Sequence, residues 1–218
     1  MKIESPVLRK KRGVKIVAAL KKEFQEAGTA LHFSNPLQLL IATMLSAQCT
    51  DVRINMVTPM LFAKYKTAKN FAEADLPDLE NDIRSTGFYH MKAKNIINAC
   101  KILETEFHGI LPQSMELLTK LPGVGRKTAN CVLGGAFGLQ EGVVVDTHVA
   151  RISKRLGLTG QTDPEKIEQD LISLIPRSDW YLFSNLIILH GRKTCIARNP
   201  KCKACSLLRL CLYDQKTK

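Results

Sequence analysis

The sequence predicts an all-α protein. Helical spacing of apolar residues recurs along the 218-residue chain, and Val143–Val145 is the only β-branched run, too short to indicate a sheet. The connections between the helical patterns are short, and no fixed-period repeat or low-complexity segment interrupts them. The longest irregular stretch, residues 138–145, indicates a boundary between two helical lobes.

Apolar periodicity and capping residues predict the individual helices. The first is expected at residues 14–27, and residues 36–48 are apolar almost all round, which predicts a buried helix. Asp51 is the expected N-cap of the next helix, which runs to about Tyr65. Asp163 is expected to cap a helix that begins with proline. The remaining helices are expected at residues 78–85, 91–107, 114–120, 126–137, 147–156, 165–175 and 179–190.

The chain is strongly basic, because 32 Lys and Arg against 20 Asp and Glu give a formal charge of +12. Such a surface attracts polyanions, of which nucleic acid is the commonest in a cell, and a charge that only serves solubility is the alternative. Residues 1–13 lack the apolar core of a signal peptide, and no stretch reaches the roughly 18 apolar residues of a membrane span. We therefore expect an intracellular protein, with Cys49, Cys100 and Cys131 as reduced core residues.

Four cysteines near the C-terminus predict a metal centre. Cys195, Cys202, Cys205 and Cys211 stand in the spacing C-x6-C-x2-C-x5-C. Thiolate-only ligation suits zinc or an iron–sulfur cluster, whereas two disulfides are expected in a secreted chain, and chance clustering is the remaining alternative. A zinc ribbon usually has two C-x2-C pairs, and this chain has one. The spacing therefore favours an iron–sulfur cluster over zinc.

A glycine turn, Leu-Pro-Gly-Val-Gly-Arg-Lys-Thr-Ala, joins two helical patterns at residues 121–129. Gly123 and Gly125 allow a tight turn whose N–H groups lie beside the next helix N-terminus, where an anion is favoured. Val124 is expected to pack into the core and Leu121 to anchor the first helix. An ordinary helix–helix loop is the alternative, but the flanking residues match a helix–hairpin–helix DNA-binding element.

A lysine and an aspartate are the candidate catalytic pair. Lys127 falls in the first turn after the hairpin, and Asp146 follows the Val143–Val145 run. An isolated amine has a pKa of about 10.4 and needs help to act as a nucleophile, which the positive end of a helix supplies in part. A nearby carboxylate favours the ammonium, so Asp146 is expected to accept a proton and to stabilise a cationic sugar. The alternative is that Lys127 only binds phosphate and Asp146 only caps the helix that starts at Thr147.

Together these residues resemble the endonuclease III family of DNA repair glycosylases. The hairpin, Val145-Asp146-Thr147-His148, the four cysteines and Leu45-Ser46-Ala47-Gln48-Cys49-Thr50-Asp51 occur in the family's order and near its spacing. The resemblance covers about residues 15–212. It implies a bifunctional DNA glycosylase and AP lyase that removes oxidised pyrimidines, such as thymine glycol, from duplex DNA. Lys127 would attack C1′ of the damaged nucleotide and form a Schiff base, with cleavage 3′ to the abasic site by β-elimination, and Asp146 would be the catalytic aspartate.

The resemblance also implies ligands and DNA contacts. The four cysteines would hold a [4Fe–4S] cluster, which is expected to be structural, and Gln48 would fill the hole left by the extruded nucleotide. Phe88 stands where the family commonly has a leucine wedge beside the opposite base, and Asp51 matches the damaged-base pocket. The further DNA contacts implied are Gly123, Val124, Gly125, Arg126, Thr128 and His148, and the basic residues Arg198, Lys201 and Lys203 between the cysteine ligands. A structural role for His148 and a merely solvated basic loop are the alternatives.

The implied architecture has two lobes with DNA in the groove between them. A six-helix barrel with the helix–hairpin–helix would occupy residues 29–139, and a cluster domain would combine residues 1–28 and 140–218. The expected partner is double-stranded DNA with oxidised pyrimidines or abasic sites, bound by a monomer on the nucleoid in the cytoplasm of a prokaryote, with no membrane. The rivals are a monofunctional adenine or mismatch glycosylase, which lacks a lysine at the position of Lys127, a non-catalytic DNA-binding module and a redox sensor.

Overall fold

The computed structural model describes residues 4–213, and within that range it contains eleven α-helices, four short 3₁₀ helices and no strand. The all-α prediction is therefore confirmed. The chain divides into two compact units, Thr29–Leu139 and a second unit from the segments on either side, of which residues 4–28 and 140–213 are described. No helix in the described range is long and apolar enough to cross a membrane.

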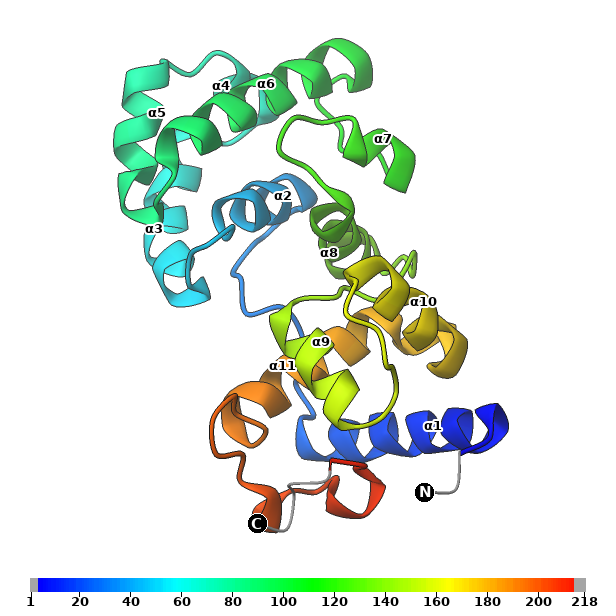
Figure 1. Cartoon of the computed structure of the whole chain (residues 1–218). Helices are drawn as coiled ribbons and strands as arrows, with labels where there is room; N and C mark the ends of the chain where they lie inside the picture. The colour runs from blue at the N-terminus through cyan, green and yellow to red at the C-terminus, as the bar shows by residue number, and fades with distance from the viewer. Residues whose placement is uncertain (1–3, 214–218) are drawn as a thin grey trace. The chain divides into compact units, whose positions relative to one another are not determined.

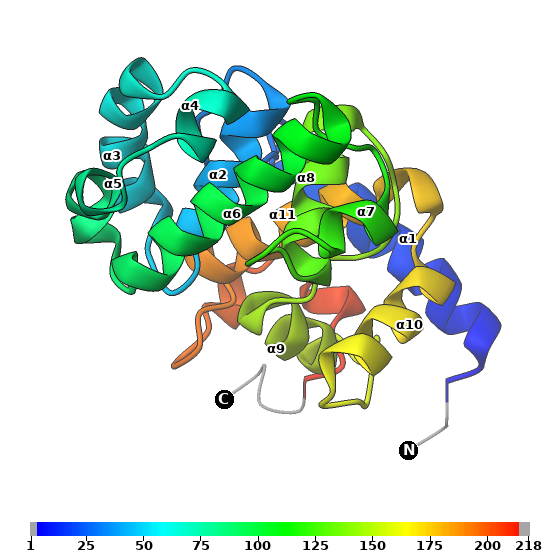
Figure 2. The ribbon, with the colours of Figure 1, turned by 90° about the horizontal axis from the view of Figure 1, so that it is seen from above.

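The unit Thr29–Leu139 is built around α2, whose apolar side chains are almost all buried. Figure 1 shows the long α6 beside α4 and α5, and Figure 2 shows α6 crossing α2. Leu39, Leu40 and Ile41 of α2 are at most 1% exposed and form the centre of the core. The helices of this unit are α2 (Pro36–Leu45), α3 (Asp51–Lys64), α4 (Ala68–Ala72), α5 (Leu76–Ile83), α6 (Tyr89–Phe107), α7 (Met115–Thr119) and α8 (Arg126–Phe137), with the 3₁₀ helix η1 at Arg84–Thr86.

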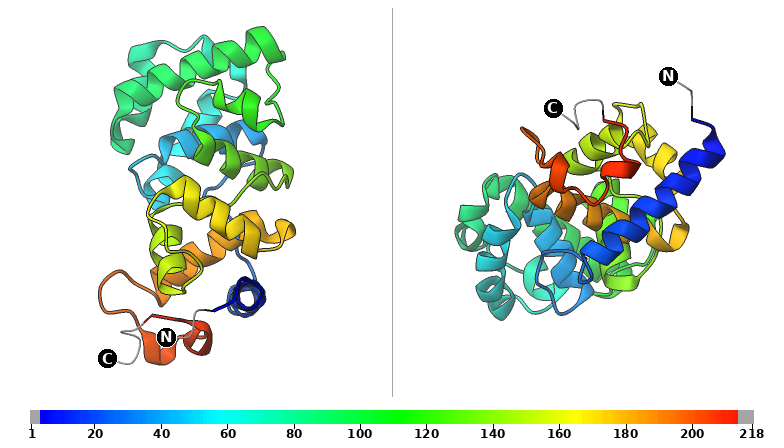
Figure 3. Two further views of the ribbon diagram at one scale, coloured as in Figure 1. Left: turned by 45° about the vertical axis from the view of Figure 1, so that its right-hand side comes forward. Right: turned by 90° about the horizontal axis from the view of Figure 1, so that it is seen from below.

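The second unit combines the N-terminal helix with the C-terminal part of the chain. Its helix α1 packs against α10 and α11 through Ile16, Val17 and Leu20, which are buried. Figure 3 shows the C-terminal segment passing beside α1. The helices of this unit are α1 (Pro6–Glu23), α9 (Thr147–Arg155), α10 (Pro164–Leu174) and α11 (Trp180–Lys193), with the 3₁₀ helices η2 (Arg177–Asp179), η3 (Cys202–Ala204) and η4 (Leu208–Leu210).

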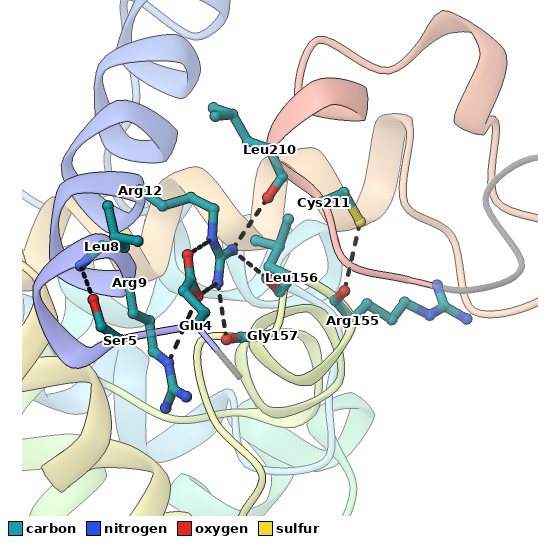
Figure 4. A network of polar contacts seen from close by, with 10 residues as sticks. All are labelled: Glu4, Ser5, Leu8, Arg9, Arg12, Arg155, Leu156, Gly157, Leu210 and Cys211. Atoms are coloured by element: carbon teal, nitrogen blue, oxygen red, sulfur yellow. Dashed lines mark hydrogen bonds and ion pairs between the residues drawn. The ribbon is translucent and has the colours of Figure 1, made fainter. Parts of the chain in front are cut away.

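One arginine fastens α1 to distant parts of its own unit. The guanidinium of Arg12 donates hydrogen bonds to the carbonyl oxygens of Leu156, Gly157 and Leu210, and it pairs with Glu4 at 2.7 Å (Figure 4). The Arg12 side chain is only 10% exposed, and its hydrogen bond to the Glu4 carboxylate lowers the pKa of that carboxyl. Charge-assisted bonds of this kind are about twice as strong as neutral ones. They hold the N-terminal helix against the loop that carries the last cysteine.

Most helix boundaries lie within about three residues of the prediction, and the larger or more informative differences fall in the first three helices. The first helix begins at Pro6 rather than at residue 14, because the Ser5 hydroxyl accepts the N–H of Leu8 and caps it. Thr50, not Asp51, is the N-cap of α3, since the Thr50 hydroxyl accepts the N–H of Arg53 and Asp51 is already helical. The buried helix α2 ends at Leu45 instead of residue 48.

Of the three cysteines predicted to be reduced core residues, only Cys100 lies fully in the core. None of the seven cysteines, all in the described range, forms a disulfide. Cys100 is fully buried, and burial raises the pKa of its thiol to about 12. Cys49 and Cys131 are half-buried, so they border the core of their unit rather than filling it.

Candidate functional site

The turn between α7 and α8 has the geometry that its two glycines predict. Gly123 has a φ of 77°, and a Cβ there would lie 2.9 Å from Asn95 Nδ2 and 3.1 Å from Met44 Cε. Val124 is 4% exposed, as expected, and its N–H donates to the carbonyl of Leu121 at 3.0 Å. A tight turn therefore forms on a buried valine anchor.

The N-terminus of α8 follows this turn directly. Gly125 is the N-cap residue, and no side chain accepts a capping hydrogen bond there. The N-terminal end of a helix favours an anion. A Cβ built on Gly125 would have nothing within 4 Å, which leaves the backbone approachable. Arg126 and Lys127 are exposed and Thr128 is half-buried. The amine of Lys127 is thus presented beside a backbone that suits an anion.

Two exposed residues with left-handed backbones flank one pocket in the same unit. Gln48 has a φ of 54° and Phe88 a φ of 49°, and Phe88 is 66% exposed. The pocket has a volume of about 240 Å³. It is lined by Met44, Ala47, Gln48, Phe88, Met91, Lys92, Asn95 and Gly123. The structure therefore brings the predicted hole-filling residue, the predicted wedge and the hairpin to one place, while Asp51 lies half-buried at the start of α3.

Asp146 caps the helix that follows it. Its Oδ1 accepts a hydrogen bond from the N–H of Val149 at 2.8 Å, at the N-terminus of α9. The capping role that competes with catalysis is thus present, and the other carboxylate oxygen takes no part in the cap. Asp146 belongs to the unit that contains α1, whereas Lys127 belongs to Thr29–Leu139.

His148 is half-buried in the first turn of α9. Burial lowers the pKa of its imidazole, Asp146 opposes that shift, and Arg151 and Arg192 add to it. A Cβ on Gly191 would lie 2.6 Å from His148 Nδ1, so α11 approaches the ring as closely as a glycine permits. This packing favours the neutral ring and supports the structural alternative for His148.

The four C-terminal cysteines line a single cavity, together with Arg155 and His190. Within the described residues, no three His, Cys, Asp or Glu side chains are arranged to hold a single metal ion. His190 Nε2 lies 3.7 Å from the Sγ of Cys205. Four thiols, none in a disulfide, on one cavity form a sulfur-only donor set.

Arg155, the last residue of α9, contacts both ends of this cysteine set. Its guanidinium lies 3.4 Å from the Sγ of Cys195 and donates to the carbonyl oxygens of Ile196 at 2.9 Å and Ala197 at 2.8 Å. The carbonyl oxygen of Arg155 lies 3.5 Å from the Sγ of Cys211 (Figure 4). The cavity therefore has a cation at its wall, which would offset the negative charge of thiolates.

Between the cysteines, the predicted basic loop is exposed. Arg198, Lys201 and Lys203 are all solvent-accessible, and Asn199 has a left-handed φ of 53°. The N–H of Lys201 donates to the carbonyl of Thr194 at 3.0 Å, which closes the loop.

Sequence reasoning missed Arg155 and Lys92, because an arginine or lysine in a helical pattern is ordinarily an exposed residue.

A family model described as HhH-GPD superfamily base excision DNA repair protein matches residues 41–177, which is more than half of the chain. The chain is 54% identical to the endonuclease III of Synechocystis sp., over 93% of this chain and 93% of that protein. It is 44% identical to the Bacillus subtilis endonuclease III over 88% of both chains. It is 38% identical to the Escherichia coli endonuclease III over 96% of this chain and 99% of that protein.

Solved structures give the same picture. The chain is similar to an endonuclease III in a non-covalent DNA complex, with a TM-score of 0.87 and 43% identity over 93% of this chain and 95% of that chain. The same values relate it to a trapped endonuclease III–DNA covalent intermediate. A thermostable thymine-DNA glycosylase matches with a TM-score of 0.84 at 21% identity, over 93% and 96% of the two chains, which shows a shared fold alone.

Proposed function

Because the chain belongs to the endonuclease III family of HhH-GPD superfamily base excision DNA repair proteins, we propose that it removes oxidised pyrimidines such as thymine glycol from duplex DNA, with Lys127 as the nucleophile. Family membership carries the reaction class, a bifunctional DNA glycosylase and AP lyase. The observation that supports the residue assignment is the exposed position of Lys127 in the first turn of α8, directly after a glycine turn at a helix N-terminus, which suits an anion.

The proposed reaction uses the neutral amine of Lys127 as a covalent catalyst. Its Nζ attacks C1′ of the damaged nucleotide, the C1′–N bond breaks, and the base leaves with a proton. Opening of the sugar ring gives an iminium between Nζ and C1′. Removal of a proton from C2′ then expels the 3′ phosphate by β-elimination, and water hydrolyses the iminium to release Lys127.

We assign proton transfer and charge stabilisation in this reaction to Asp146. The cap holds the carboxylate through Oδ1, so its orientation is set before substrate binds. The second oxygen, Oδ2, can take the proton that Nζ loses on attack, and the carboxylate charge stabilises the cationic sugar. Capping and catalysis are therefore compatible roles for one side chain.

The DNA contacts follow from exposure and charge. The hairpin amides at Gly123 and Gly125 would hold a phosphate, and the basic residues Arg198, Lys201 and Lys203 would add contacts that weaken as salt rises. Gln48 and Phe88 would enter the base stack when the damaged nucleotide is extruded, Gln48 into the vacated space and Phe88 beside the opposite base. The formal charge of +12 supports a polyanionic partner.

We assign Cys195, Cys202, Cys205 and Cys211 as ligands of a [4Fe–4S] cluster. The donor set suits it, because four thiols line one cavity and Arg155 supplies a compensating cation. When bound, the cluster cross-links residues 195–211, and no step of the reaction uses it. The loop with the basic residues would then be held in one conformation.

We propose two domains, and the division of the chain into two compact units supports this. We infer that residues 29–139 form the six-helix barrel domain with the helix–hairpin–helix, and that residues 1–28 and 140–218 form the cluster domain. We further infer a monomer that acts on the nucleoid in a prokaryotic cytoplasm, in keeping with its bacterial relatives.

Borohydride trapping tests the proposal. The purified protein is incubated with a duplex that carries one thymine glycol, and reduction should give a covalent adduct that an undamaged duplex does not give. Lys127→Ala should abolish the adduct. Lys120→Ala should retain it, because Lys120 is an exposed lysine at the end of α7, before the glycine turn, and pairs with Glu116 at 3.0 Å. Base release without an adduct would indicate a monofunctional glycosylase, and binding without release would indicate a DNA-binding module.

A further inference from the structure

A buried lysine ties together the two segments that lead to Gln48 and Phe88. Lys92 lies on α6 and is 7% exposed. Its Nζ donates to the carbonyl oxygen of Leu45 at 2.7 Å and to that of Thr86 at 2.9 Å. Leu45 is the last residue of α2, three residues before Gln48, and Thr86 ends η1, two residues before Phe88. The N–H of Lys92 also donates to the carbonyl of Phe88 at 3.1 Å.

The electrostatics of α2 explain how an ammonium can be buried there. The last carbonyls of a helix lack partners within it and carry partial negative charge. No basic residue of α2 lies in its own last turn, so Lys92 of α6 supplies the cation that this end favours. Burial lowers the pKa of Lys92, because removal from water is a cost to the charged ammonium. A methionine would fill the same space without that cost, so packing alone does not account for the lysine.

The two residues that follow these segments are both strained. Left-handed backbones are unfavourable for residues with a Cβ and persist only where the surroundings hold them. Gln48 and Phe88 have such backbones, both are exposed, and both line the pocket that Lys92 also lines. Lys92 therefore forms its hydrogen bonds at the end of α2 and at the end of η1, where the segments that contain Gln48 and Phe88 begin.

We propose that Lys92 is a positioning residue that couples Gln48 to Phe88, so that the two side chains enter the duplex as one unit. The inference rests on the proposed function, because it takes Gln48 and Phe88 as the residues that enter the base stack. One ammonium bonded to both segments holds their separation constant. Without the ammonium, each segment can move independently of the other, although the Gln48 and Phe88 side chains are still present.

A double-mutant cycle measures this coupling directly. The dissociation constant for a duplex with one tetrahydrofuran abasic analogue is measured by fluorescence anisotropy for Gln48→Ala, Phe88→Ala and the double variant. With Lys92 present, the fold-change in Kd of the double variant should differ by about fivefold from the product of the two single fold-changes. In the Lys92→Met background, which removes the donors and keeps the chain length, the coupling should fall to less than about twofold.

Two controls separate positioning from general stability. Lys94→Met changes an exposed lysine of the same helix, and Leu103→Ala destabilises the core of α6 away from both segments, and both should leave the coupling at about fivefold. Lys92→Leu repeats the cycle if the methionine variant folds poorly. Unchanged coupling in a folded variant without the Lys92 ammonium would overturn the inference. Full binding by both Gln48→Ala and Phe88→Ala would instead overturn their proposed roles, and the inference with them.

Discussion

The two hairpin glycines should respond very differently to alanine, although they stand only two residues apart. Gly123 has a φ of 77°, and an added Cβ would meet Asn95 Nδ2 at 2.9 Å, Asn95 Cβ at 3.0 Å and Met44 Cε at 3.1 Å. The left-handed backbone costs about 1–2 kcal/mol for a residue with a Cβ, and displacing the Asn95 side chain adds about 1 kcal/mol. Gly123→Ala should therefore lower the free energy of unfolding by about 2–3 kcal/mol.

Gly125 provides the matched comparison. Its backbone is extended, with a φ of −87°, and a Cβ there would have nothing within 4 Å. Because alanine is a poorer N-cap residue than glycine, Gly125→Ala should cost less than about 1 kcal/mol. Urea unfolding followed by circular dichroism measures both changes under conditions where iron content is unchanged. Equal costs for the two substitutions, or a larger cost at Gly125, would refute the reasoning from backbone and contact geometry.

Two further predictions concern the unit that contains α9. Cys202→Ala should lose iron, measured by elemental analysis, and should lower the resistance of this unit to urea, because the proposed cluster cross-links residues 195–211. The control Cys100→Ala should keep its iron. A Cys202→Ala protein with its full iron content would contradict the ligand assignment. The pKa of His148 is lowered by burial, so the unfolded chain binds its proton at a higher pH than the folded protein does. Stability is therefore full above about pH 6.5 and falls as the pH drops towards the folded-state pKa, and His148→Gln should flatten this dependence in urea titrations between about pH 7.5 and 5.5. Some dependence should persist because burial also lowers the pKa of His190, but an unaltered slope in His148→Gln would show that His148 does not contribute.

Periodicity and capping predicted most helices of this chain because their signals are local. The helix Arg126–Phe137 begins after a glycine turn and ends before Gly138, as the sequence indicates. The short α4 was missed, because five residues carry too little periodicity, although Thr67 and Asn70 form a capping box that marks its start. The first half of α1 was missed for a related reason: its residues are mostly polar, so only the cap at Ser5 announces it.

The residues of the candidate site were likewise predicted where their signals are local and missed where they depend on tertiary contacts. Motif spacing singled out Lys127, Asp146 and the cysteines, because each follows a recognisable turn, cap or ligand pattern. The left-handed backbones of Gln48 and Phe88 carry no such signal, since neither residue is a glycine or asparagine. The contacts of Lys92 join carbonyls that are 47 and 6 residues away along the chain, and backbone acceptors leave no trace in the identity of the side chains. Tertiary structure alone reveals them.

The bonds of Arg12 have a consequence for the order in which the chain can fold during synthesis. Its acceptors include the carbonyl of Leu210, which the ribosome adds almost two hundred residues after Arg12. The unit Thr29–Leu139 is contiguous and can fold as soon as it emerges, whereas α1 must wait for the C-terminal segment. We therefore expect that in nascent chains that stop before Leu210 the unit Thr29–Leu139 is folded, while the segments on either side of it are not yet packed together. In such chains the buried face of α1, with Ile16 and Leu20, is exposed to chaperones and proteases.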